Sequence, residues 1–138
     1  MSAAQNVMAS EPQQVQWHYV CETNDLVTNS GVCALVDSQQ VAIFSLKING
    51  ETQVFAISNY DPIGKANVLY RGLLGSIGGA PVVASPLYKE HYFLETGLCK
   101  EHDDVSVTAY AVKVEGEKVF VGVQANCLYL NAHMKKAF

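Results

Sequence analysis

The chain has 138 residues, of which 49% are hydrophobic and 16% are charged, and its formal net charge is −4 at pH 7. This length predicts one domain, and the composition is that of a compact globular chain rather than a disordered one. No basic stripe appears, so binding to nucleic acid is not expected. No apolar stretch approaches the roughly 18 residues of a membrane span.

The N-terminal residues and the cysteines indicate the cellular compartment in which the protein is expected. Residues 1–14 are polar with one charge, Glu11, and lack the basic start and apolar run of a signal peptide. We therefore expect a flexible N-terminal arm. Scattered cysteines without a close pair favour reduced thiols and a cytoplasmic protein. The four cysteines are Cys21, Cys33, Cys99 and Cys127.

The hydrophobic pattern is that of β-strands, beginning with Gln16 to Glu22. Alternation there places Trp17, Tyr19 and Cys21 on one side of a half-buried strand. Residues 31–58 follow as a predicted three-stranded meander. Its second turn is Asn49-Gly50, a pair that tolerates positive φ and so is typical of a tight hairpin.

After residue 58 the pattern loosens into a loop and then returns to short strands. Turns every eight to twelve residues predict an antiparallel sandwich or barrel. We expect this all-β domain over residues 15–123 and a separate C-terminal tail over residues 124–138. The expected later strands are residues 73–77, 81–86, 91–94, 105–114 and 118–123.

Two histidine–cysteine pairs are candidate zinc ligands. His18 and Cys21 form one pair, and Cys99 and His102 form the other. On a regular strand, however, His18 and Cys21 point to opposite faces, so both could bind one ion only across a bulge. We favour two unrelated pairs. The acidic residues around His102, at positions 101–104, indicate a solvated turn rather than an acid–base pair.

Two loops carry a resemblance to a known family. Residues 85–97, SPLYKEHYFLETG, resemble the second ligand loop of Rieske iron–sulfur domains. That loop reads C-P-x-H, then four residues, then an aromatic, Leu and Thr-Gly. Residues 59–72, NYDPIGKANVLYRG, resemble the first, C-P-H, loop. The resemblance covers Trp17 to Val123 and implies a Rieske-like antiparallel β-sandwich or barrel with both loops at one tip.

The resemblance places other residues where the cluster ligands would be. Asp61 and Ser85 stand at the two cysteines, and Ile63 and Tyr88 stand at the two histidines. A Rieske cluster needs two thiolates on one iron and two imidazoles on the other. Isoleucine cannot bind iron, and hydroxyl oxygens are poor ligands for a soft iron–sulfide cluster. We therefore expect no cofactor, no metal ligand and no catalytic residue in this chain.

Four short motifs are similar to those of one cluster-less group, the small subunits of bacterial assimilatory NAD(P)H-dependent nitrite reductase. The resemblance implies an accessory chain for a cytoplasmic enzyme that reduces nitrite to ammonia. The large subunit would then be the partner, and it would hold sirohaem, a [4Fe–4S] cluster and FAD. The motifs are NYDP at 59–62, ANVLYRG at 66–72, ASPL at 84–87 and GLCKE at 97–101.

Tyrosine and arginine are favoured anchors in protein interfaces. We therefore expect the tip to dock on the large subunit through Tyr60, Arg71, Tyr88 and Lys89. Two alternatives remain open. The first is a metal-binding or electron-transfer protein with atypical ligands, or a zinc-stabilised module through Cys99 and His102. The second is a stand-alone β domain that binds a small ligand.

Overall fold

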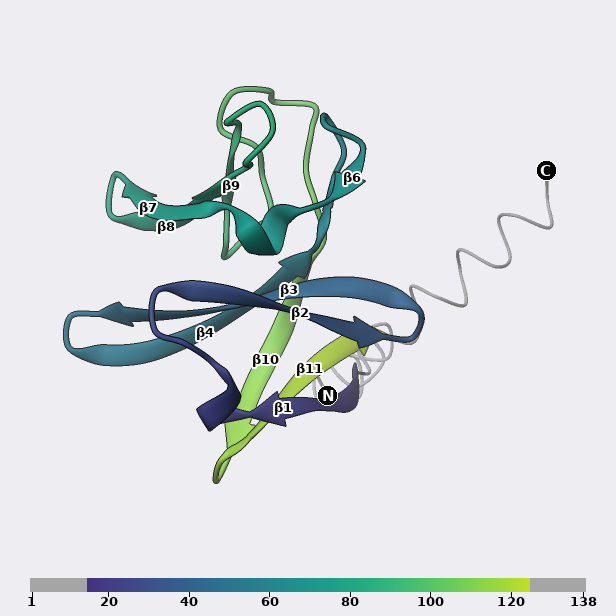
Figure 1. The fold of residues 1–138 in the computed structure, drawn as a ribbon, viewed down its shortest axis with the longest axis vertical. Helices are drawn as coiled ribbons and strands as arrows, with labels where there is room; N and C mark the ends of the chain where they lie inside the picture. The colour runs from purple at the N-terminus through teal and green to yellow at the C-terminus, as the bar shows by residue number, and fades with distance from the viewer. Residues whose placement is uncertain (1–14, 125–138) are drawn as a thin grey trace, which may run out of the picture.

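The structure is a computed structural model that describes residues 15–124 (Figure 1). The expected N-terminal arm and the C-terminal tail after Gln124 lie outside the described residues. No helix within residues 15–124 is long and apolar enough to cross a membrane.

Most of the chain forms one antiparallel sheet of six strands in the order β1-β11-β10-β4-β3-β2. The sheet curls on itself, and its two edge strands, β1 and β2, come into contact. The six strands are β1 (Val15–Glu22), β2 (Ser30–Val36), β3 (Gln39–Ile48), β4 (Glu51–Ser58), β10 (Ala109–Glu115) and β11 (Lys118–Gln124). A short 3₁₀ turn, η2 (Thr23–Asp25), follows β1.

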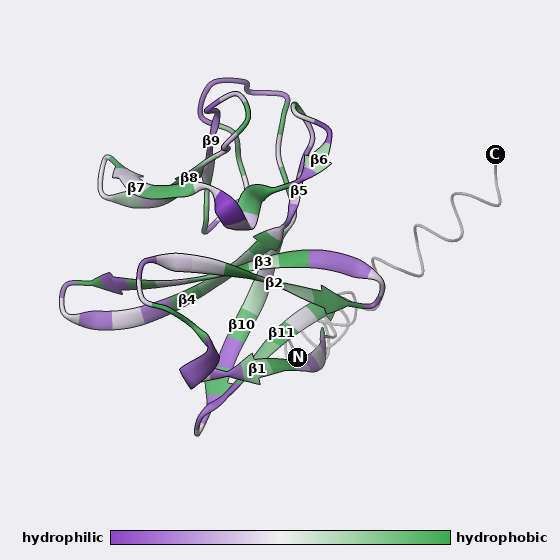
Figure 2. Ribbon diagram, viewed as in Figure 1, coloured by the Kyte–Doolittle hydropathy of each residue, from purple (hydrophilic) through white to green (hydrophobic). Residues whose placement is uncertain are grey.

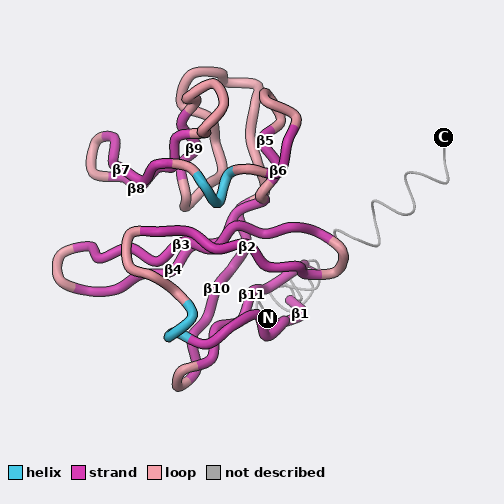
Figure 3. Tube along the Cα trace, in the orientation of Figure 1, coloured by secondary structure: helices cyan, strands magenta, loops and turns pink. Residues whose placement is uncertain are grey.

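A second, smaller part is inserted between β4 and β10 and stands at one side of the large sheet (Figure 1). It holds a three-stranded sheet in the order β7-β8-β9, the two-stranded pair β5-β6, and a 3₁₀ turn, η3. Loops make up much of it (Figure 3). Its elements are β5 (Tyr60–Asp61), β6 (Ala66–Asn67), η3 (Leu69–Arg71), β7 (Leu73–Ile77), β8 (Ala80–Ala84) and β9 (His91–Phe93).

Strand β3 is the centre of the fold because both of its faces are covered. Phe44 belongs to a core cluster that joins the large sheet to the inserted part and that also contains Tyr92. Ile43 faces a second cluster with Val121, inside the curled sheet. All side chains from residue 41 to 46 are consequently buried, and the strand reads as continuously apolar rather than alternating. Apolar segments run along β3 in Figure 2.

The predicted meander is confirmed, with β3 and β4 paired in register across the Asn49-Gly50 turn. Both turn residues have positive φ, 53° and 83°. The strand expected at residues 105–114 begins only at Ala109. The residues before it make single bridges and turns instead, such as the bridge between Leu98 and Ser106.

The expected grouping of β1 side chains is confirmed for Trp17 and Tyr19, which share a side, but was wrong for Cys21. Trp17 and Tyr19 are on the exposed side, 39% and 52% exposed, while Val20 packs against the inner core cluster. The register to β11 also shifts between Tyr19 and Cys21, so the strand contains a bulge there. His18 and Cys21 consequently lie opposite Val121 and Val119. They share one face, which regular alternation excluded.

Candidate functional site: two loops joined at a buried carboxylate

The two loops meet at the positions that resemble cysteine ligands. Asp61 ends β5 in the first loop, and Ser85 follows β8 in the second. Both residues are completely buried. The Ser85 hydroxyl donates a hydrogen bond of 2.5 Å to Oδ2 of Asp61. The two loops are therefore linked directly, side chain to side chain.

The side-chain carboxylate of Asp61 accepts three further hydrogen bonds, all at Oδ1. The backbone N–H groups of Ile63 and Gly64 donate to it over 2.9 and 3.1 Å. The hydroxyl of Tyr92, a fully buried residue of β9, donates over 3.0 Å. A single carboxylate thus joins its own loop, the second loop and the sheet behind them.

These donors decide the charge of Asp61. Burial by itself raises the pKa of a carboxyl group. Here the hydrogen bonds from Ser85, Gly64, Tyr92 and Ile63 stabilise the anion more than burial opposes it, so the pKa of Asp61 lies below its usual value. Burial and the bond to this carboxylate raise the pKa of Tyr92. The network is consequently an ionised carboxylate held by neutral donors.

The second loop closes tightly around Ser85. Its backbone N–H donates to the carbonyl of Glu90 at 2.8 Å, and its carbonyl accepts from Lys89 at 3.1 Å. The Ser85 hydroxyl also accepts from the N–H of Leu87 at 3.2 Å. Leu87 in turn packs over Gly64, where an added Cβ would lie 2.5 Å from its methyl carbon. A larger residue at position 64 would have to displace the Leu87 side chain and would press on the Asp61 carboxylate.

The two positions that resemble histidine ligands do not belong to this network. Ile63 is half-buried and packs against the core cluster around Tyr92. Tyr88 is 65% exposed. Neither offers an imidazole. With the Asp61 and Ser85 oxygens already engaged with each other, the four residues do not fit a [2Fe–2S] cluster of the Rieske type.

Two anchoring residues of the loops were missed from the sequence. Tyr92 was read only as part of a short strand. Asn59 was read as part of a motif, yet it is fully buried and bonds in two directions. Its amide group donates to Gln40 of β3 at 3.0 Å, and its side-chain oxygen accepts from the N–H of Tyr70 at 2.8 Å. The sequence signal that could have identified Asn59 is its position directly before the first loop, where its side chain can both donate and accept hydrogen bonds.

The candidate zinc pairs are not brought together. Among residues 15–124 no group of three or more potential ligands is arranged to hold a metal ion. His18 lies 3.6 Å from Asp37. Cys99 is buried, and burial raises the pKa of its thiol. In the turn at 101–104, Glu101 is not merely solvated, because it accepts from the backbone N–H of His91 at 2.9 Å and meets the ring Nδ1 at 2.7 Å.

The four candidate docking residues lie in three places. Tyr88 and Lys89 are exposed in the second loop, and Tyr60 is 43% exposed in β5. Arg71 ends η3, which packs against β2 and β3 at the base of the inserted part (Figure 3). Its side chain stacks on Tyr70 and bonds the Tyr70 hydroxyl at 3.1 Å.

Comparison with known proteins agrees with this geometry. The model of the Rieske-like [2Fe-2S] domain family matches residues 16–122. The nitrite reductase (NADH) small subunit of Salmonella typhimurium is 45% identical over 100 residues, covering 72% of this chain and 91% of that subunit. This chain belongs to the Rieske-like family of nitrite reductase small subunits. The resemblance stated from the two loops is thereby confirmed, as is the all-β Rieske-like fold.

Two further similar proteins are a solved structure and a longer protein that contains a domain of this kind. The NMR structure of the Escherichia coli protein NirD has a TM-score of 0.72 to this member at 40% identity, covering 81% of this chain and all of that one. The nitrite reductase NAD(P)H large subunit of Klebsiella oxytoca is 41% identical over 108 residues, which are 78% of this chain and 11% of that protein. A domain of this family thus also occurs inside a large subunit.

Proposed function

We propose that this chain is the accessory small subunit of a cytoplasmic NAD(P)H-dependent nitrite reductase. The large subunit carries out the reduction of nitrite to ammonia. The small subunit binds to it, supports its activity, and supplies no redox centre of its own.

The observation that carries the proposal is the domain found within the Klebsiella oxytoca large subunit. Two domains that occur in one chain are held near each other by that chain. The small-subunit relative from Salmonella typhimurium is a separate chain, yet it is similar over nearly its whole length. Binding between this chain and a large subunit would preserve the same arrangement.

The absence of a redox centre is supported by the chemistry of the loops. The fold family is named for a cluster that needs two thiolates and two imidazoles. At the corresponding positions this chain has a carboxylate saturated by four donors, a serine hydroxyl bonded to it, an isoleucine and an exposed tyrosine. Electron transfer within the enzyme is therefore assigned to the large subunit.

The docking surface that we propose is the tip, the part of the molecule formed by the two loops at residues 59–72 and 85–97. Exposed apolar and aromatic side chains gather in and beside its loops, among them Leu87 at 44% and Tyr88 at 65% exposed. Lys89 adds a positive charge in a chain whose net charge is negative. Aromatic and cationic side chains of this kind are typical interface anchors. Arg71 lies at the base of the inserted part and would contact the large subunit at the rim of this docking surface.

The direct test is binding of the large subunit by this chain with altered tips. We expect Tyr88→Ala with Lys89→Ala to weaken the complex by at least tenfold in Kd. Tyr19→Ala with Lys118→Ala is the matched control, because that pair also removes one tyrosine and one lysine but lies on the large sheet. Arg71→Ala tests whether the rim of the docking surface also contributes to binding. Unchanged affinity in the Tyr88, Lys89 and Arg71 variants would remove the tip as the docking surface.

Loss of the proposed function itself would look different. If the unaltered chain neither bound the large subunit nor changed its rate of nitrite reduction, the accessory role would be wrong. Both measurements use the two purified subunits, with NADH and NADPH supplied in parallel.

A further inference from the structure

One strand of the inserted part has an open edge. β7 is the outer strand of the sheet β7-β8-β9, and within residues 15–124 it pairs with β8 alone. Its sequence, LLGSI, contains no charge and no proline, the residues that usually protect an edge strand from pairing. Leu73 is 75% exposed, and a Cβ added at Gly75 would meet no atom within 4 Å. Leu73, Gly75 and Ser76 are exposed, so a large part of this strand is accessible.

The register shows which backbone groups are free. Ile77 pairs with Ala80 across the two-residue Gly78-Gly79 turn, so alternate residues of β7 bond inward to β8. The groups of Leu74 and Ser76 then point outward. Within residues 15–124 no backbone hydrogen bond outside the strand ladders uses either of them. Each offers one N–H donor and one carbonyl acceptor to a further strand.

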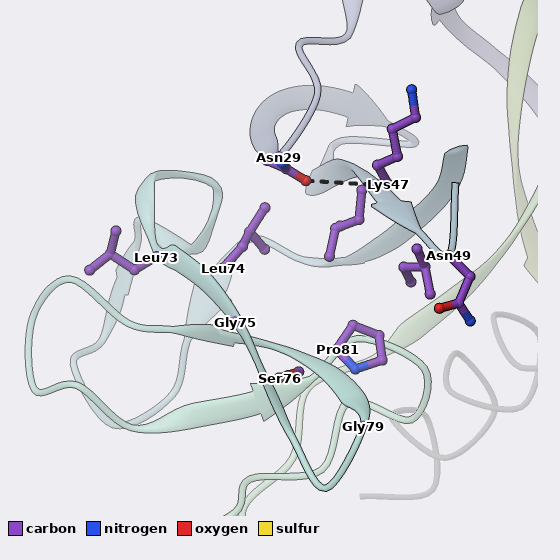
Figure 4. Close-up of a pocket in the computed structure, with 11 residues that line it drawn as sticks. Asn29, Lys47, Asn49, Leu73, Leu74, Gly75, Ser76, Gly79 and Pro81 are labelled. Atoms are coloured by element: carbon purple, nitrogen blue, oxygen red, sulfur yellow. Dashed lines mark hydrogen bonds between the residues drawn. The ribbon is translucent and has the colours of Figure 1, made fainter. Parts of the chain in front are cut away.

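A groove of about 540 Å³ runs beside this edge. Its opposite wall is the end of the β3–β4 hairpin, and Leu46, Ile48, Leu74 and Pro81 give it an apolar lining. In Figure 4, Leu74 and Pro81 lie along it, whereas the ammonium group of Lys47 points away. An extended peptide paired with β7 could therefore place an uncharged apolar side chain here.

Two occupants are disfavoured by the geometry. A second copy paired edge to edge would contribute only the five residues of its own β7. So short a contact buries much less surface than the roughly 1,200 Å² of a stable dimer interface. The ends of the described chain, Val15 and Gln124, pair with each other. They lie on the side of the large sheet opposite the β3–β4 and β7–β8 turns (Figure 1). A segment leaving either end would have to run the length of the sheet first.

A short strand on β7 is thus best supplied by a protein that is already held at another surface. We propose that an extended, uncharged segment of the large subunit adds to β7 as a fourth strand, bonding the backbone of Leu74 and Ser76 and seating one apolar side chain between Leu46, Leu74 and Pro81. This rests on the proposed function, because the tip supplies the first point of attachment. Once the large subunit is bound at the tip, its extended segment is held at a high effective concentration near β7, so the two contacts together bind more tightly than either alone.

Ser76→Pro tests the added strand. Proline removes the outward N–H but leaves the inward bonds of β7 in place, since Ser76 faces Pro81 in a pair that exchanges no hydrogen bonds. Ser76→Thr keeps the N–H at the same position and is the matched control. We expect Ser76→Pro to raise Kd for the purified large subunit at least tenfold and Ser76→Thr to change it less than twofold.

Hydrogen exchange of the unaltered chain gives an answer that does not depend on how the proline variant folds. In the complex we expect the amides of Leu74 and Ser76 to exchange at least tenfold more slowly than in the free chain. Equal exchange in both states would overturn the added strand even if the complex forms. Failure of the unaltered chain to bind at all would instead overturn the proposed function and the added strand with it.

Discussion

Asp61 is the residue on which the arrangement of the two loops depends most. In a Rieske domain iron joins the loops through thiolates and imidazoles. In this chain a carboxylate joins them through hydrogen bonds to Ser85 and Tyr92. A buried anion is stable only when its lone pairs are occupied by donors, and all four donors come from the loops and the strand behind them.

Removal of the carboxylate should therefore be costly. Asp61→Ala leaves two backbone N–H groups and two hydroxyls buried without an acceptor, and we expect a loss of about 3–5 kcal/mol in the free energy of unfolding. Asp61→Asn retains the oxygen that serves Ile63, Gly64 and Tyr92, so we expect a loss of only about 1–2 kcal/mol. Urea unfolding of the three proteins measures the difference. Equal losses for both variants would contradict the network.

The charge of Asp61 predicts a pH dependence of stability. Its pKa is lower in the folded chain than in the unfolded chain. The stabilisation is therefore fully present above the unfolded value, near 3.9, and is lost as the pH falls through the folded value. Between pH 7 and pH 3 the unaltered chain should lose more stability than Asp61→Asn. Parallel curves would show that Asp61 does not carry this dependence.

At the scale of elements, glycines close the loops where another residue would collide. Gly97 ends the second loop with φ of 81°, and an added Cβ would lie 1.9 Å from the carbonyl oxygen of Val107. Its N–H donates to Phe93 at 2.7 Å, and its carbonyl accepts from Val107 at 2.8 Å. The loop consequently turns back onto the segment that leads into β10.

Gly97→Ala should destabilise the chain by about 3 kcal/mol, since it combines an unfavourable φ with a backbone collision. Gly75→Ala is the control, because Gly75 lies in open space with ordinary strand geometry. We expect it to change stability by no more than about 1 kcal/mol. Thermal unfolding of both variants measures this. Similar changes in Tm would contradict the role of Gly97.

The elements differ in how far the sequence could predict them. β3, β4 and β7 were predicted at their bounds because local turn residues define their ends. The bulge in β1 depends on its pairing with β11, about a hundred residues away, and no local pattern reports it. Residues 105–108 alternate like a strand, but in the fold Val105 and Val107 support the second loop through bonds to Cys99 and Gly97.

The candidate site shows the same limit. Loop spacing placed Asp61, Ser85, Ile63 and Tyr88 at the four ligand-like positions. It could not show that Asp61 and Ser85 bond to each other, nor that Tyr92 completes the network from a different strand. Those contacts are long-range, and only the packing of the inserted part against the large sheet creates them.

At the scale of the whole molecule, the fold has two parts, the curled large sheet and the inserted part. The curled six-stranded sheet is stabilised by its own inner core cluster, and the inserted part shares a second cluster with it through β3. The proposed partner contacts, the tip and the edge of β7, both belong to the inserted part. The large sheet would then act as the support on which a docking unit is held.

The most direct test of the central proposal is iron and sulfide analysis, with a visible spectrum, of the chain purified without oxygen. The residues at the four ligand-like positions predict a folded, colourless protein with less than about 0.1 iron per chain. Stoichiometric iron and sulfide with charge-transfer absorption would contradict it. The chain would then be an electron carrier whose ligands lie outside the Asp61 network.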